Sequence, residues 1–153
     1  MARTRCGVDD TPGAGSGSEL LAALGPTLFV HIGFDKAWRE ISKTPPVGGV
    51  QNIQALVDTG ASESCIDALV ATQIGLPIVD RRPIAGVSGE HMVNMYLAQI
   101  YVPALTFTIF GAFAGVDLLA GSQAHGALIG RTFLRHFTMV YEGRTGTVTI
   151  HNE

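Results

Sequence analysis

Asp58 is the residue of this sequence best placed to do chemistry. It follows the apolar segment Ala55-Leu56-Val57 and precedes Thr59 and Gly60. This position is unusual for a carboxylate, because the segment before it is continuously apolar, whereas a strand with one face in solvent alternates apolar and polar residues. The triplet Asp-Thr-Gly alone is weak support, since it arises by chance in roughly 3% of chains of this length. The surrounding sequence therefore has to support any catalytic role.

The chemistry open to such a carboxylate is general acid–base catalysis of hydrolysis. One group must take a proton from the attacking water, while another gives a proton to the reacting carbonyl oxygen. Two facing carboxylates do both, because like charges so close together cannot both ionise and the pair holds one shared proton. The chain has no second Asp-Thr-Gly and no Asp-Ser-Gly. A pair of Asp58 carboxylates therefore requires a twofold homodimer, in which one surface serves both partners.

The elements around Asp58 are expected to form a mostly antiparallel β architecture with two short helices. Residues 28–32 and 50–57 are predicted strands. A helix is predicted over residues 67–77, where an aspartate suited to cap precedes apolar residues, and Gly and Pro end the pattern. A second helix over residues 131–137 and a hairpin over residues 138–150 are expected to end the chain.

A glycine-containing hairpin is predicted in the middle of the chain. Gly86 and Gly89 lie between Pro83 and a long β-rich run over residues 92–102. Such a tip has the conformational freedom of a hinge. A passive hairpin turn is the alternative, because glycine-rich turns are common in β proteins.

The apolar run before Asp58, the glycine hairpin and the segment Ala127–Gly130 together resemble the retropepsin-like aspartic proteases, over about residues 27–153. The resemblance implies a closed β fold with one lobe per chain, and a homodimeric endopeptidase that cuts an extended peptide. It implies that Asp58 is the catalytic carboxylate, that Thr59 hydrogen-bonds across the subunit boundary, and that Gly60 lets substrate approach the backbone. The alternative is a noncatalytic module that binds a peptide or protein on the same fold without cleaving it.

The resemblance also assigns a substrate-binding set and a supporting pair. The expected substrate-binding residues lie in the active-site loop, in the hairpin that would fold over the peptide, and before Gly130: Ala61, Ser62, Ile84, Ala85, Gly86, Val87, Ser88, Gly89, Leu128 and Ile129. Gly130 and Arg131 match the glycine and the arginine that brace the active-site loop in this family.

Two residues depart from the family pattern. Ser62 stands where many members carry an aspartate that pairs with the arginine matched by Arg131, so this ion pair is expected to be missing or rerouted to Glu63. Ala61 replaces a serine that is common in pepsin-type sites, and so removes a hydroxyl that stabilises the ionised pair. A less acidic pH optimum than that of pepsin is the expected result.

Length and composition favour one folded domain and argue against several classes of partner. The 153 residues are 46% hydrophobic and 15% charged, so the chain can bury a core. The formal net charge of −3 leaves no basic footprint for nucleic acid. A mean hydropathy of +0.29 with few charges indicates apolar surface covered by another subunit. No apolar stretch is long enough for a membrane span, and none follows the basic start as in a secretory signal.

Residues 1–26 are expected to be a flexible N-terminal extension, because Gly13–Ser18 has the composition of a linker; the domain would then begin at Thr27. The two cysteines, Cys6 and Cys65, have neither the number nor the spacing of a disulfide framework or a zinc site, which favours a reducing cytoplasm. Cys65 is expected to be a small buried residue rather than a nucleophile. The five histidines show no metal-ligand spacing, so no metal and no cofactor are expected.

Overall fold

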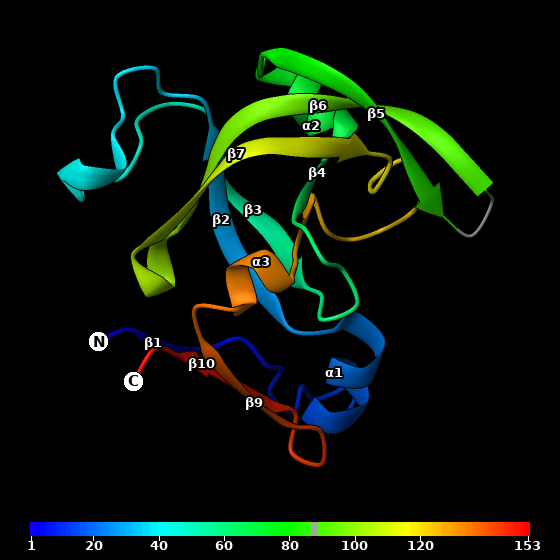
Figure 1. The fold of residues 1–153 in the computed structure, drawn as a ribbon. Coiled ribbons are helices and arrows are strands. Elements are labelled where there is room, and N and C mark those ends of the chain that lie inside the picture. The colour runs from blue at the N-terminus through cyan, green and yellow to red at the C-terminus, as the bar shows by residue number, and fades with distance from the viewer. Residues whose placement is uncertain (87–88) are drawn as a thin grey trace.

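The computed structural model describes residues 1–86 and 89–153 and shows a mostly β chain with one large and one small sheet (Figure 1). The large sheet has the order β2-β3-β8-β4-β7-β6-β5, and a further pairing of β2 with β6 closes it. Its strands are β2 (Thr27–Gly33), β3 (Val50–Val57), β4 (Cys65–Asp67), β5 (Ile78–Gly86), β6 (Gly89–Val102), β7 (Phe107–Val116) and β8 (Ala127–Ile129). The closed, mostly β fold expected from the sequence is confirmed.

Helices and a three-stranded terminal sheet complete the fold. The α-helices are α1 (Gly17–Leu24), α2 (Ala68–Gln73) and α3 (Arg131–Leu134), and the short 3-10 helices are η1 (Glu40–Ser42) and η2 (Pro103–Leu105). The terminal sheet has the order β1-β10-β9, from β1 (Arg3–Arg5), β9 (Thr138–Glu142) and β10 (Thr147–His151). The two predicted short helices are present as α2 and α3, and α1 is a further helix in the segment assigned to a flexible extension. Across residues 1–86 and 89–153, no helix is long and apolar enough to cross a membrane.

The N-terminal segment is built into the fold and does not form the flexible extension that its composition predicts. β1 pairs antiparallel with β10, so both chain ends lie in one sheet (Figure 1). Cys6 and Leu21 are buried in the core, with 4% and 1% of their surface exposed. Ser16 and Glu19 start α1 with a reciprocal capping box, in which each side chain accepts from the other's backbone amide. The sequence prediction missed this capping box because the glycine- and serine-rich composition around it is typical of a linker.

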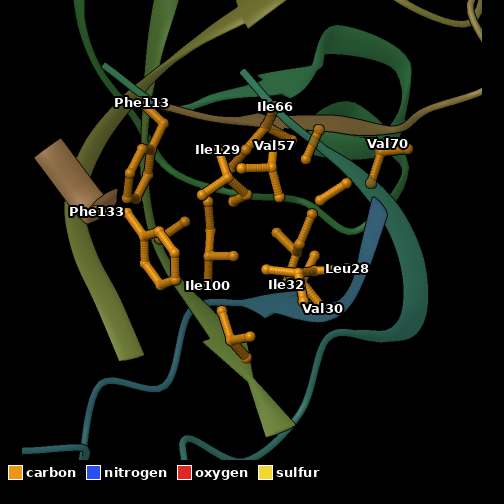
Figure 2. Close-up of a cluster of buried hydrophobic side chains, with 14 of the residues drawn as sticks. Leu28, Val30, Ile32, Val57, Ile66, Val70, Ile100, Phe113, Ile129 and Phe133 are labelled. Atoms are coloured by element: carbon orange, nitrogen blue, oxygen red, sulfur yellow. The ribbon is translucent and has the colours of Figure 1, made fainter. Parts of the chain in front are cut away.

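The core is made mainly of aliphatic side chains of the closed sheet (Figure 2), and it extends to α1 through Leu21 and to β10 through Val148 and Ile150. In β2, Leu28, Val30 and Ile32 are buried and alternate with more exposed residues, as expected when one face of a strand meets the core. Each fully buried side chain of this kind contributes about 1.5–3 kcal/mol. Ile129 and Phe133, on either side of the turn into α3, join this core with no exposed surface. The strands that carry the candidate site are therefore anchored in the buried core.

A crossing of three strands positions Asp58. β3 runs parallel to β8, with Val57 opposite Ile129, and β4 runs antiparallel to β8, with Cys65 opposite Leu128. The loop of residues 58–64, which leaves β3 and enters β4, therefore passes around the end of β8. Buried parallel pairing also explains why the residues before Asp58 are continuously apolar.

Candidate active site

The backbone around Asp58 forms a tight turn with the carboxylate drawn back over it. The Asp58 amide donates to the carbonyl oxygen of Ile129 at 2.8 Å, which fixes the end of β3 to the end of β8. The Ala61 amide donates to the Asp58 carbonyl oxygen at 3.2 Å. Oδ1 of Asp58 accepts from the Gly60 amide at 2.9 Å. Asp58 is half-buried while Gly60 is exposed, so the carboxylate is held in place yet remains open to a reactant.

The start of α3 holds the second half of this loop. The Arg131 amide donates to the Ala61 carbonyl oxygen at 2.9 Å, and the Thr132 amide donates to the Ser62 carbonyl oxygen at 3.0 Å. These amides belong to the first turn of a helix, where they have no partner within the helix itself. The carbonyl groups of the loop thus accept from the free amides of the helix, and these hydrogen bonds hold the loop in place.

Gly130 allows this close approach of loop and helix. A Cβ atom at Gly130 would lie 2.7 Å from the carbonyl carbon and oxygen of Glu63, and 2.9 Å from the carbonyl oxygen of Ala61. The Gly130 amide donates to Oγ of Ser64 at 3.0 Å, and Ser64 is buried. The predicted bracing glycine is therefore in contact with the loop. Ser64 was not predicted, and its only signal in the sequence is a hydroxyl at the entrance to an apolar strand.

Arg131 contacts the active-site loop through a carbonyl group. Its Nη1 atom donates to the carbonyl oxygen of Thr59 at 2.7 Å. The structure forms no ion pair between Arg131 and Glu63 among the residues that it describes, and Ser62 offers no charge. The ion pair is therefore missing rather than rerouted. The guanidinium still supports the residue that follows Asp58.

An apolar hollow lies next to Asp58, on the surface where Thr59 is exposed. It has a volume of about 400 Å³ and is lined by Thr59, Arg131, Leu134, Arg135 and Met139. β9, which carries Met139, is an edge strand of the terminal sheet and exposes Val140 and Tyr141 by 44% and 51%. The residue types of Leu134 and Met139 gave no sequence signal that set them apart from core residues.

The predicted glycine hairpin is present and extends from the body of the molecule (Figure 1). β5 and β6 pair up to Gly86 and Gly89, and Gly89 has a φ of +106°, which favours glycine. Ala85 is exposed and Ile84 half-buried near the tip. The other two predicted hairpin residues, Val87 and Ser88, lie outside the described residues.

The two remaining members of the predicted substrate-binding set differ in exposure. Leu128 is half-buried, so part of its side chain faces away from the core. Ile129 has no exposed surface and belongs to the core cluster that also contains Ile66 and Phe133 (Figure 2). The assignment of Ile129 to substrate contact is therefore wrong for its side chain. Its contribution to the site is the carbonyl group that accepts from Asp58.

The ionisable side chains of Cys65 and Asp67, which follow the active-site loop, have structural roles. Burial, with a smaller effect of the nearby Asp58 charge, raises the pKa of the Cys65 thiol to about 11 and keeps it protonated at neutral pH. Asp67 is 1% exposed, and its carboxylate accepts from the backbone amides of Val70, Leu118 and Leu119. Within the described ranges, no group of three or more His, Cys, Asp or Glu residues is arranged to hold a metal ion.

Comparison with known proteins identifies the fold. No protein-family model and no curated protein matches the chain. A retropepsin-like aspartic protease from Rickettsia conorii is similar in structure, with a TM-score of 0.54, 14% sequence identity and coverage of 97% of this chain and 89% of that one. A lower TM-score of 0.47 relates the chain to EIAV protease in complex with the inhibitor HBY-793, at 18% identity over 72% of this chain and 85% of that one. The likeness to the Rickettsia structure shows a retropepsin-like fold.

Proposed function

From this fold and from the geometry around Asp58, we propose that the chain is an aspartic endopeptidase that acts as a homodimer. The observation that carries the proposal is a half-buried carboxylate at the end of a core strand, in a turn that is fixed from both sides. Asp58 is tied to β8 through Ile129, and the rest of its loop is tied to α3. Such support keeps a reacting group in one geometry, which catalysis requires.

The proposed reaction is direct attack by water on a peptide carbonyl carbon. Asp58 and the partner's Asp58 hold the water between them and share one proton. The ionised carboxylate takes a proton from the water, and the protonated one donates to the carbonyl oxygen, which gives a tetrahedral intermediate. Transfer of a proton to the leaving nitrogen then breaks the carbon–nitrogen bond. No covalent bond to the protein forms at any stage.

Three features of the surface around Thr59 support the homodimer: the exposure of Thr59 itself, the apolar hollow and the free edge of β9. Thr59 is exposed and borders the apolar hollow that also contains Leu134 and Met139. β9 leaves one edge of the terminal sheet without a strand neighbour among the described residues. An isologous interface over this surface would bury the apolar groups and bring the two Asp58 side chains to the twofold axis.

The substrate in this proposal is an extended peptide that binds between the floor of the site and the two hairpins. Gly60 and Ala61 form the floor, and Leu128 contributes an apolar wall. The described residues of the hairpin, Ile84, Ala85, Gly86 and Gly89, cover the peptide. Peptides with apolar side chains next to the cut bond are the expected substrates, because Ala61 and Leu128, in the proposed floor and wall, are apolar and half-buried.

Two further features of the sequence predict the pH optimum and the redox compartment of the protein. Ala61 supplies no hydroxyl to stabilise the ionised pair, so we expect a pH optimum less acidic than that of pepsin. Cys6 and Cys65 are both unpaired thiols, which supports a reducing compartment such as the cytoplasm.

The proposal is tested by digestion of casein and of a peptide library between about pH 3 and pH 8, a range that spans ordinary carboxyl pKa values. The parent protein and an Asp9→Asn variant, altered at an exposed site, should cut equally. Asp58→Asn should fold and not cut. Equal cutting by Asp58→Asn refutes the proposal. Peptide binding without cutting by the parent at every pH would instead support the noncatalytic module.

A further inference from the structure

β7 has a free edge over most of its length. It pairs with β6 from Phe107 to Ala114, but its other edge, within residues 1–86 and 89–153, meets a strand only from Ala114 to Val116, where it pairs with β4. Among the described residues, no backbone hydrogen bond outside the sheet pairing involves residues 107–113. A free strand edge presents unpaired amide and carbonyl groups, and so acts as a template for one more strand.

A hollow of about 590 Å³ follows this free edge. One side consists of every residue from Phe107 to Phe113. The other side is formed by α3 with the residue that follows it, by the active-site loop and by η1: Thr132, Phe133, His136, Glu63, Ser64 and Glu40. A second hollow of about 340 Å³ shares Glu40, Phe107 and Thr108 with the first, and so continues it. A seven-residue strand is about 20 Å long, which matches the free edge.

The long segment of residues 34–49 forms the wall of the second hollow and projects from the body of the molecule (Figure 1). Its base is fixed by Gln99, whose side chain both accepts from the Asp35 amide and donates to the Asp35 carbonyl oxygen. The Asp35 carboxylate accepts from the Val47 amide across the segment. The Trp38 ring packs on Phe110 of β7, with centroids 5.3 Å apart. The wall is therefore held against β7 by specific contacts.

The two hollows together form one groove along β7, and the exposed carboxylates in it favour a basic occupant. Glu40 and Glu63 are both exposed, and neither takes part in an ion pair among residues 1–86 and 89–153. His136 and Lys43 are the basic groups that line the two hollows. Arginine suits this surface best, because its guanidinium pairs with a carboxylate and also stacks on exposed aromatic rings such as Phe110.

The groove and the apolar hollow beside Thr59 use different sides of α3. Thr132 and Phe133 of α3 line the groove together with the following His136, whereas Arg131 and Leu134 of α3 line the apolar hollow together with the following Arg135. Occupation of the groove is therefore compatible with the proposed dimer and requires neither the dimer nor catalysis.

We propose that the free edge of β7 binds an extended peptide segment with alternating arginine and apolar side chains, which adds to the sheet as a new strand. The added strand lies along the free edge of β7 and beside α3, outside the contact between the Phe107 and Phe133 rings, with its arginines at Glu40 and Glu63. Main-chain hydrogen bonds to Phe107–Phe113 supply much of the affinity, and the carboxylates select for positive charge.

The test uses Asp58→Asn protein, so that no probe is cut, and fluorescein-labelled heptapeptides followed by fluorescence anisotropy. The first probe alternates arginine and valine, and its control alternates glutamate and valine. Two further probes carry N-methyl groups on either set of alternate amides of the arginine peptide. A strand uses alternate amides on each edge, so one N-methylated probe should bind as the parent probe does and the other should lose binding.

Variants locate the site. Glu40→Gln and Glu63→Gln should each weaken binding of the arginine probe by about two- to fivefold, and Glu153→Gln, at the other end of the chain, should not. The probe should shift the NMR amide signals of residues 107–113. No saturable binding up to about 1 mM, equal binding of the arginine and glutamate probes, or equal binding of both N-methylated probes refutes the proposal. Cleavage by the parent protein is measured separately, so failure here leaves the protease proposal unaffected.

Discussion

Gly130→Ala is expected to destabilise the protein by pushing the active-site loop away from α3. The new Cβ atom would lie 2.7 Å from backbone atoms of Glu63 and 2.9 Å from the carbonyl oxygen of Ala61. Backbone atoms cannot rotate away as the end of a side chain can, and overpacking of this kind costs about 1–3 kcal/mol. Removal of glycine from the unfolded chain returns only about 0.4–1 kcal/mol. The net loss in the free energy of unfolding is therefore at most about 2.6 kcal/mol, and about 1.3 kcal/mol at the midpoints of the two ranges.

Urea unfolding followed by far-ultraviolet circular dichroism measures this loss. Gly143→Ala is the matched control, because its Cβ would meet only the ring of Tyr141, at 3.2 Å, and this ring is able to move. The control should stay within about 0.5 kcal/mol of the parent. Cleavage by Gly130→Ala should also fall, since the displaced loop carries Asp58. A Gly130→Ala variant as stable as Gly143→Ala would refute the reasoning about backbone contact.

Three further predictions concern buried ionisable groups. Asp67→Ala should lower the free energy of unfolding by about 2–4 kcal/mol in urea, because three backbone amides lose their acceptor, while Asp9→Ala at an exposed site stays within about 0.5 kcal/mol; equal effects would contradict this. Burial lowers the pKa of His125 below its ordinary value of 6.5, so the unfolded chain takes up the proton first as the pH falls. Stability present above pH 6.5 should therefore decline below it, and His125→Gln should flatten that decline in urea unfolding; an unchanged slope speaks against a buried imidazole. Burial raises the pKa of the Cys6 and Cys65 thiols to about 11, so a thiol-specific reagent at about pH 8 should label the native protein far more slowly than the urea-unfolded one. Rapid labelling of either native thiol would contradict the burial.

Elements with a strong local pattern were predictable from the sequence. β2 and β3 follow from apolar runs bounded by turn residues, and α2 from the aspartate before it, since Asp67 does accept from the Val70 amide. The predicted helix nevertheless ends at Gln73 rather than near residue 77. Gly75 has a φ of +68°, so the helix has already ended when the chain reaches it.

Features that depend on contacts between distant residues were not predictable. α1 and β1 are held by Cys6, Leu21 and pairing with β10, at the other end of the sequence. The burial of Ile129 could not be read from its type, because Leu128 beside it is equally apolar. For Gly130, the resemblance gave a supporting role, but the physical reason is its contact with Glu63, which only the folded chain provides.

Mixing parent protein with Asp58→Asn protein tests most directly whether one site needs two Asp58 carboxylates. The two forms are mixed in a ninefold excess of the variant, under conditions that let subunits exchange. With random pairing, only about one parent subunit in ten finds a parent partner, so cleavage per parent subunit should fall to roughly one tenth. Asp9→Asn protein in the same excess should not reduce cleavage. Cleavage that stays constant per parent subunit at every ratio of Asp58→Asn would contradict the shared site.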